Sequence, residues 1–380
     1  MDNRSGLRRR WIAAGAAGLV VLVATVVAVS VAPGLTERNE VVPPLSLPLV
    51  PAPAAPTADA SSPLSATWRA PADLPAGGTI GSVRIPASAS GFSARDAQVY
   101  LPPAALVPDA PALPFVLMMM GQPGDPDAGP IASVLDAFAA THNGLAPIVL
   151  VADQLGDPDV DSLCLDTAEY GQVETYLEQD VLAWARGNLN IEAARDSWTV
   201  AGFSNGGQCA LSLALRYPEV WGSVIDASGT VYAGLETEPD VLADVFGGDQ
   251  AAYDATKPAT LLAKSRYPDT TAVFTVGSED SVMEPGLKDL SGTARAAGVA
   301  VTYYEVPGEG HSFEALGGGL TEAFGSLASR LGLGLGSTWT VSRRFCARTS
   351  CTAPSSSART RCPQRPWCSS SPAGRLFAGS

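Results

Sequence analysis

Residues 199–207, Thr-Val-Ala-Gly-Phe-Ser-Asn-Gly-Gly, constrain the fold of this chain more than any other stretch. A β-prone run leads into the motif Gly-x-Ser-x-Gly, and a helix-prone run follows it directly. Strand, sharp turn and helix form the setting in which this motif is a nucleophile elbow. Gly202 and Gly206 suit such a turn, because side chains there would collide with neighbouring backbone. We therefore expect Ser204 to be exposed at the carboxyl end of a strand, facing the positive end of a helix.

A serine hydroxyl needs a base that removes its proton and a carboxylate that orients the base. The chain has only two histidines. His311 lies in a glycine-flanked loop that follows the β-like run 301–306. His142 precedes Asn-Gly at the expected end of a helix, where a solvated helix cap is the simplest role for it. His311 is therefore the candidate base.

The candidate acid is Asp280, which lies four residues beyond the strand-like run 272–276. Site residues of open α/β sheets gather at the carboxyl ends of strands. Three other acids compete with it: Glu279, Asp226 and Glu309. Asp280 is favoured because its distance from the strand end is the usual one for this role. The order Ser204, Asp280, His311 is the order of the α/β-hydrolase triad.

Each of these three residues also has a purely structural interpretation. Ser204 could cap a helix, since serine is favoured at that position. Asp280 could close a turn, and His311 could be an ordinary surface histidine. Three such residues, each after its own strand and in this order, are much less expected by chance than any one of them.

Charge is distributed unevenly along the chain, whose net charge is −14. Residues 1–10 and 341–380 together hold eleven of the 24 basic residues and one of the 38 acidic ones. The remainder has 13 basic against 37 acidic residues, a net charge near −24. This excess of acid disfavours nucleic acid or an anionic membrane surface as a partner of the central region.

The N-terminus has the pattern of a membrane anchor. A basic segment, residues 1–10, precedes the uncharged run 11–32. As a helix this run would be about 33 Å long, enough to cross a bilayer. The preceding arginines predict a cytoplasmic N-terminus and an extracytoplasmic catalytic domain at the cell membrane. A cleaved signal peptide, and hence a secreted protein, is the alternative, and the length of the run favours the uncleaved anchor.

Two further segments have the composition of unfolded chain. Residues 33–76 are rich in proline and alanine, which favours an extended, semi-rigid linker. Residues 336–380 form a basic tail rich in cysteine, serine and arginine, whose cysteine spacing matches no zinc pattern. We expect the tail to be disordered, and a frameshift in the gene would explain its abrupt change of composition.

Residues 77–335 are the expected catalytic domain. The runs 80–86 and 97–102 flank a Gly/Ser turn and predict a β-hairpin. The alternation of apolar runs and helical patterns after them predicts an α/β fold with a mostly parallel central sheet flanked by helices. The expected strands are 114–120, 147–152, 197–202, 223–227, 272–276 and 301–306. The expected helices are 171–188, the helix after the elbow, 287–297 and 320–331.

A candidate oxyanion site follows the strand 115–120, which runs into Gly-Gln-Pro-Gly. In chains with a nucleophile elbow, this loop and the residue after the nucleophile each supply a backbone N–H. The donors would be Gln122, or Gly121, together with Asn205, and a simple glycine turn is the alternative. Three successive methionines in the strand are expected to pack in the core. Acyl transfer by a triad needs no metal and no organic cofactor, so we expect neither.

The sequence resembles the esterase D / mycolyltransferase-like esterase family of the α/β-hydrolase superfamily. The similarity lies in the elbow with residues 210–218, in 100–103, in 246–253 and in 308–313, and spans about 78–333. It implies an α/β-hydrolase fold with Ser204 as nucleophile, Asp280 as acid and His311 as base. Two departures bear on substrate choice. Methionine precedes Gly121 where many relatives have histidine, and Asn205 stands where methionine is frequent.

We expect an exported serine esterase that hydrolyses carboxylic esters through an acyl-enzyme. The resemblance also admits an acyltransferase that moves an acyl group to a cell-envelope sugar. A third alternative, from another class, is a catalytically inactive envelope protein that uses the fold to bind. The expected partners are a small ester or an acylated sugar, and the membrane through the N-terminal helix, with no nucleic acid.

Cys164 and Cys209 are the only cysteines within the expected domain. One lies in an Asp-rich loop and the other lies one turn into the elbow helix. Because the domain is expected to be exported, we hypothesise a disulfide between them, with two buried thiols as the alternative. Such a bond would stabilise the fold by at most about 4 kcal/mol through loop entropy.

Overall fold

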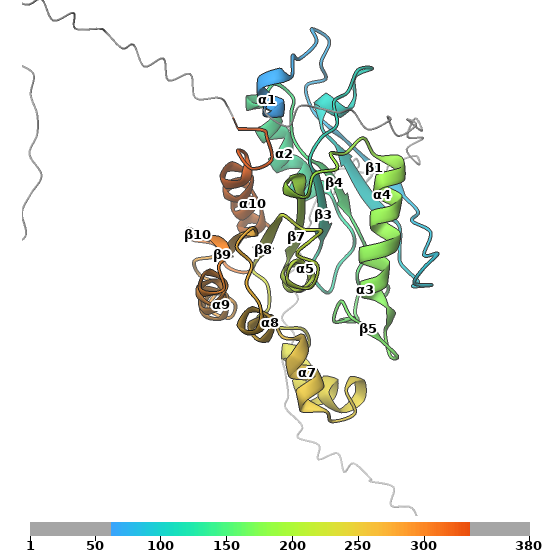
Figure 1. The fold of residues 1–380 in the computed structure, drawn as a ribbon, viewed down its shortest axis with the longest axis vertical. Helices are drawn as coiled ribbons and strands as arrows, with labels where there is room; N and C mark the ends of the chain where they lie inside the picture. Colours follow the sequence, from blue (N-terminus) through green and yellow to red (C-terminus); the bar gives the residue numbers. More distant parts are fainter. Residues whose placement is uncertain (1–61, 335–380) are drawn as a thin grey trace, which may run out of the picture. The chain divides into compact units, whose positions relative to one another are not determined.

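A computed structural model describes residues 62–334, which form an eight-stranded sheet with helices on both sides (Figure 1). The strand order is β1-β2-β4-β3-β7-β8-β9-β10. Figure 1 shows α2 and α10 on one side of the sheet, with α3 and α4 on the other. The strands are β1 (Thr79–Val83), β2 (Ala97–Leu101), β3 (Phe115–Met119), β4 (Ile148–Val151), β7 (Trp198–Phe203), β8 (Ser223–Ala227), β9 (Thr271–Gly277) and β10 (Ala300–Val306). A second, two-stranded sheet pairs β5 (Asp166–Thr167) with β6 (Gly171–Gln172).

The sheet is parallel from β4 to β10 and antiparallel only at its β1-β2-β4 edge. Every residue of β3, β4, β7 and β8 is buried. Strands covered on both faces read as continuous apolar runs, which is why the sequence located them to within a residue or two. The parallel pairing brings the carboxyl ends of β3, β7, β9 and β10 to one edge of the sheet. The predicted α/β architecture and the predicted hairpin are confirmed.

The main helices are α2 (Gly129–Thr141), α3 (Val173–Thr175), α4 (Leu182–Asn188), α5 (Asn205–Arg216), α9 (Glu284–Ala296) and α10 (Phe313–Leu327). The elbow helix α5 packs on β7, β8 and β3. Helix α10 begins seven residues before its predicted start at 320, because Ser312 Oγ caps it by accepting from the N–H of Ala315 (3.0 Å). Glycines 317–319 interrupt its apolar pattern, and Gly319 lies where a Cβ would overlap the side chain of Thr275.

The predicted helix 171–188 is not one regular helix. It opens with a short strand, β6 (Gly171–Gln172), and α3 and α4 are joined by wider π-helical turns at Tyr176–Val181. Those turns carry Asp180, whose buried carboxylate accepts from the backbone N–H groups of Ala89 (2.8 Å) and Ser90 (3.0 Å). The break in the predicted helix therefore coincides with a contact between segments about ninety residues apart in the sequence. Local periodicity does not reveal such a contact.

The folded domain begins earlier than predicted. Residues 62–76, which we assigned to the linker, lie on the domain and include α1 (Leu64–Thr67). Ser65 Oγ donates to the carbonyl of Gly334 (2.7 Å), and Trp68 Nε1 donates to the carbonyl of Asn143 (3.0 Å). The side chains of Leu64 and Trp68 also pack against the core. Proline and alanine dominate the composition there, so three scattered apolar side chains, Leu64, Trp68 and Leu74, were the only signal.

Two predicted segments, the anchor 11–32 and the tail 336–380, lie outside the described residues. Within residues 62–334, no helix is both long and apolar enough to span a bilayer.

A helical excursion, residues 230–264, separates β8 from β9. It holds a 3₁₀ turn (Leu235–Thr237), α6 (Glu238–Asp240), π-helical turns (Val241–Val245), α7 (Gln250–Thr256) and α8 (Pro258–Lys264). Its buried Val241 and Tyr253 form a small second core with Leu163 and Leu165. This core joins the excursion to the disulfide loop, which we define as residues 155–165.

Candidate active site

The elbow has the geometry that its sequence predicts. β7 ends at Phe203, and Ser204 adopts φ 56° and ψ −121° before α5 begins. A non-glycine residue in this region is strained, and such strain persists only where the surroundings fix it. Here the N–H of Ser204 donates to the carbonyl of Ala227 on β8 (2.9 Å).

Gly202 and Gly206 are required by close packing. A Cβ on Gly202 would overlap the carbonyl of Gly206, and one on Gly206 would overlap the carbonyl of Met119. The helix therefore approaches β7 and β3 more closely than any side chain at these positions would permit.

The three predicted catalytic side chains form one hydrogen-bonded chain. Nε2 of His311 lies 3.0 Å from Oγ of Ser204, and Nδ1 of His311 lies 2.8 Å from Oδ2 of Asp280. A carboxylate only accepts hydrogen bonds, so Nδ1 carries the imidazole proton and Nε2 is left to accept from the serine hydroxyl. This arrangement can remove a proton from Ser204.

Asp280 is nearly enclosed, whereas the imidazole that it orients is accessible. Asp280 is 5% exposed, and its Oδ1 accepts from the N–H of Met283 (3.1 Å). The side chain of His311 is 35% exposed, and its ring stacks on Phe203 with centroids 5.0 Å apart. The carboxylate is thus fixed, and the base can still reach a substrate.

The rival acids have other surroundings. Glu279 is exposed, and Glu309 accepts from Ser312 Oγ (3.2 Å). Asp226 is fully buried on β8, where Oδ1 accepts from the N–H of Gly229 (3.1 Å) and burial raises the pKa of the carboxyl to about 7.

His142 lies at the C-terminal end of α2, as predicted. Its Nδ1 lies 2.7 Å from the carbonyl of Phe138, and its ring stacks on that of Phe138 with centroids 3.8 Å apart. These contacts are those of a helix cap.

The predicted oxyanion donors lie beside Ser204. A Cβ on Gly121 would lie 3.2 Å from Cβ of Ser204, so this loop runs directly past the serine. Gln122 lines both cavities that contain Ser204. Asn205 is the first residue of α5, where a backbone N–H has no acceptor within the helix. The geometry is compatible with an oxyanion site, and the donor role of these amides stays a prediction.

Two cavities meet at Ser204. The acidic cavity, of about 410 Å³, is walled by the disulfide loop and the helical excursion, including Asp159, Asp161 and Glu236. The His311 cavity, of about 470 Å³, is lined by Phe313 and the loop after β3. The serine therefore has room for a substrate group on each side.

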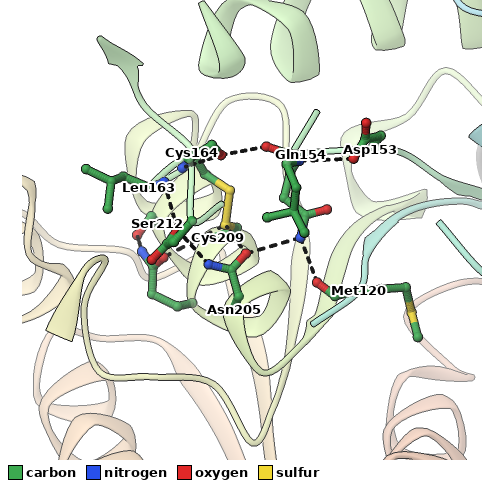
Figure 2. The surroundings of a disulfide bond; sticks show 12 residues. Met120, Asp153, Gln154, Leu163, Cys164, Asn205, Cys209 and Ser212 are labelled. Atoms are coloured by element: carbon green, nitrogen blue, oxygen red, sulfur yellow. Dashed lines mark hydrogen bonds between the residues drawn. A yellow bond between two sulfur atoms is a disulfide. The ribbon is translucent and has the colours of Figure 1, made fainter. Parts of the chain in front are cut away.

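The structure contains the hypothesised disulfide between Cys164 and Cys209 (Figure 2). It joins the disulfide loop to the first turns of α5. In the same region the amide of Asn205 donates to Oδ1 of Asp161 (2.8 Å), so the residue after the serine is tied to the loop through its side chain as well.

Sequence reasoning missed two polar residues, Asp153 and Gln154, that follow β4. Oδ1 of Asp153 pairs with Arg95 (2.6 Å), which also donates to the carbonyl of Gly124 (2.9 Å) in the loop after β3. Burial raises the pKa of Asp153, but the hydrogen bonds and charge of Arg95 outweigh it and hold that pKa below its usual range. Asp153 and Gln154 lie just beyond a buried parallel strand, and this position was a signal that could have identified them.

Comparison with protein families gives one match over most of the domain. The model of the Esterase family matches residues 88–327. An uncharacterised protein of Corynebacterium glutamicum is 35% identical over 256 residues, which cover 65% of this chain. The chain spans 60% of the length of that relative.

Solved structures of three hydrolases are similar in fold. An S-formylglutathione hydrolase from Agrobacterium tumefaciens has a TM-score of 0.56 at 20% identity, covering 68% of this chain and 97% of that one. A ferulic acid esterase has a TM-score of 0.56 at 14% identity, covering 67% and 98%. A fluorophosphonate-binding serine hydrolase of Staphylococcus aureus has a TM-score of 0.52 at 14% identity, covering 66% and 98%. The shared feature is the α/β fold with a mainly parallel sheet.

Proposed function

Because the chain belongs to the Esterase family, we propose that it hydrolyses carboxylic esters with Ser204 as nucleophile, His311 as base and Asp280 as the orienting acid. The observation that carries this proposal is the continuous hydrogen-bonded chain from Oγ of Ser204 through His311 to Asp280. It lies at a strained strand-to-helix turn, beside two cavities.

The reaction has two steps. Nε2 of His311 takes the proton of Ser204 as Oγ attacks the ester carbonyl, and backbone N–H groups of Asn205 and of Gln122 or Gly121 would stabilise the oxyanion. The imidazolium, held by Asp280, then gives its proton to the departing alcohol oxygen, which leaves an acyl-serine. Water, activated by His311, attacks that ester and releases the acid and the free serine.

The two cavities suggest which part of the ester lies where. His311 must protonate the leaving oxygen, so the alcohol group would occupy the His311 cavity and the acyl group the acidic cavity. Among the residues that line the acidic cavity are three acids and no lysine or arginine. This lining disfavours a negatively charged acyl group.

The test is hydrolysis of p-nitrophenyl butyrate by the wild type beside Ser204→Ala. We expect the variant to lose at least about 10³-fold in kcat, because the nucleophile is absent. Equal turnover by the two proteins would refute the proposal, and inactivity of the wild type toward a panel of esters would favour a binding protein.

Acyl transfer to a sugar is the second candidate, and Gln98, Asp125 and Asp127 in the lining of the His311 cavity could hydrogen-bond sugar hydroxyls. Trehalose would be added to the same assay, and acylated sugar sought by mass spectrometry. Product that depends on Ser204 would favour transfer over hydrolysis.

We also propose that residues 11–32 place the domain outside the cell membrane, on the strength of the sequence pattern alone. Fractionation of cells that express the full chain, with protease added to intact cells, tests this. Recovery of an untrimmed chain in the cytosol would exclude export.

A further inference from the structure

Gln154 connects two backbone segments that meet at Ser204. It follows β4, and only 2% of its surface is exposed. Its Nε2 donates to the carbonyl of Met120 (2.6 Å) and to Oδ1 of Asn205 (3.1 Å) (Figure 2). A side-chain amide has two N–H donors, so both donors of Gln154 are used.

Each of these two acceptors adjoins a predicted oxyanion donor. The Met120 carbonyl belongs to the peptide unit whose nitrogen is that of Gly121, just before Gln122. Asn205 carries the second predicted donor on its own backbone. One side-chain amide thus bridges the two segments that must present N–H groups to the same oxygen atom.

The bridge is part of a closed ring of hydrogen bonds. Asn205 donates to Oδ1 of Asp161 (2.8 Å), and the next residue, Ser162, donates through Oγ to the carbonyl of Gln154 (2.5 Å). The disulfide from Cys164 fixes the same loop to α5. Gln154 is therefore held at both its backbone and its side chain.

We propose that Gln154 is a positioning residue that sets the spacing of the two oxyanion donors, through Asn205 and the Met120 carbonyl. The inference rests on the proposed esterase function. Oxyanion donors act only at short, defined distances from the developing charge, and a displacement of about 1 Å can cost about 100-fold in rate. A residue that fixes their separation affects the transition state more than the bound ester.

The experiment replaces Gln154 by methionine, which is similar in length but cannot donate. For p-nitrophenyl butyrate we expect kcat to fall about 10- to 100-fold with KM changed less than about threefold. We expect Ki for a trifluoromethyl ketone, which adds to serine as a tetrahedral oxyanion, to rise by about the same factor.

Gln208→Met is the matched control. Gln208 is also a glutamine of 2% exposure, lies on α5, and donates to Ser212 Oγ (2.7 Å) instead of to either donor segment. We expect it to lose stability as Gln154→Met does, yet to keep kcat and Ki within about threefold of the wild type. Equal losses of kcat in the two variants would mean that any buried amide has this effect, and would overturn the proposal.

Asn205→Ala keeps the backbone donor and removes the bridge from the other end, so the proposal does not depend on Gln154→Met folding. We expect a similar fall in kcat, and a double variant no worse than about threefold below the poorer single variant. Additive losses would show that the two side chains act separately. Inactive Ser204→Ala beside active wild type supports the esterase function by itself. On that background, unchanged kcat and Ki in Gln154→Met would overturn only the role of Gln154.

Discussion

Ser204 and Asp280 follow strands whose residues are almost all buried, whereas the wall of the acidic cavity consists of the disulfide loop and the helical excursion. The strands are held by neighbours on both sides and by helices on both faces. The wall relies on a core of five buried side chains, the Cys164–Cys209 bond and a ring of polar contacts. The reactive groups thus depend on regular structure, and the shape of the cavity depends on cross-linked irregular structure.

The largest expected effect concerns the catalytic residues beyond the carboxyl ends of the strands. In His311→Gln the new side chain is polar and similar in size to histidine, but it cannot act as a base. We therefore expect kcat for p-nitrophenyl butyrate to fall at least about 10³-fold. The thermal midpoint should change little, because the imidazole is partly exposed. Activity within tenfold of the wild type would contradict the assignment of the base, and calorimetry of the same sample controls for folding.

The next effect concerns the cavity wall. Replacing both Cys164 and Cys209 by alanine should lower the free energy of unfolding by up to about 4 kcal/mol, because the bond closes a long loop in the unfolded chain. We expect a smaller loss of kcat than in His311→Gln, and a larger rise in KM for long acyl chains than for acetate. Urea unfolding with and without reductant measures the first part. If KM rises equally for acetate esters and long-chain esters, the wall does not shape the acyl site.

A third prediction concerns the acid beneath the elbow. Burial raises the pKa of Asp226 to about 7, so its folded-state pKa lies above that of the unfolded chain. The stability that goes with its protonated form is therefore present at pH 4 and is lost as the pH rises through 7. Asp226→Asn, which cannot ionise, should match the wild type at pH 4 and exceed its stability at pH 8 by roughly 4 kcal/mol, since about three pKa units separate the folded and unfolded states. Unfolding curves are measured for both proteins at pH 4 and pH 8, and the same difference in stability at the two pH values would contradict this prediction.

The smallest effect is expected within the excursion. The Tyr253 hydroxyl donates to the carbonyl of Ala233 (2.7 Å) in the second core. Tyr253→Phe should cost about 1 kcal/mol of stability, since one buried acceptor loses its partner. Turnover of p-nitrophenyl acetate should stay within about twofold, which a parallel kinetic assay checks. A large kinetic effect would mean that the excursion and the catalytic edge are more tightly coupled than we infer.

The sequence was sufficient for the central strands, because each buried strand is a continuous apolar run. It was also sufficient to nominate the three candidate catalytic residues, because each lies in the turn or loop that follows its strand. The elbow glycines were predictable for a similar reason, since the motif contains the packing requirement. The disulfide could be predicted because Cys164 and Cys209 are the only cysteines in the expected domain.

Other contacts between distant segments were not predictable. The bond from Gln154 to Asn205 crosses 51 residues, and neither side chain has a local pattern that announces the other. The packing of residues 62–76 depends likewise on the far end of the domain, where Gly334 accepts from Ser65. The break in the expected helix 171–188 accompanies an interaction of Asp180 with Ala89 and Ser90.

The two compartments on either side of Ser204 have a kinetic consequence for the proposed reaction. The first product can depart through one compartment while the covalently attached fragment stays in the other, which is the requirement for ping-pong turnover. The vacated compartment, about 470 Å³ in volume, is far larger than a water molecule. Water would therefore compete there with any hydroxyl compound that fits. The ratio of free acid to new ester would report which of the two acceptors reacts more often beside the imidazole.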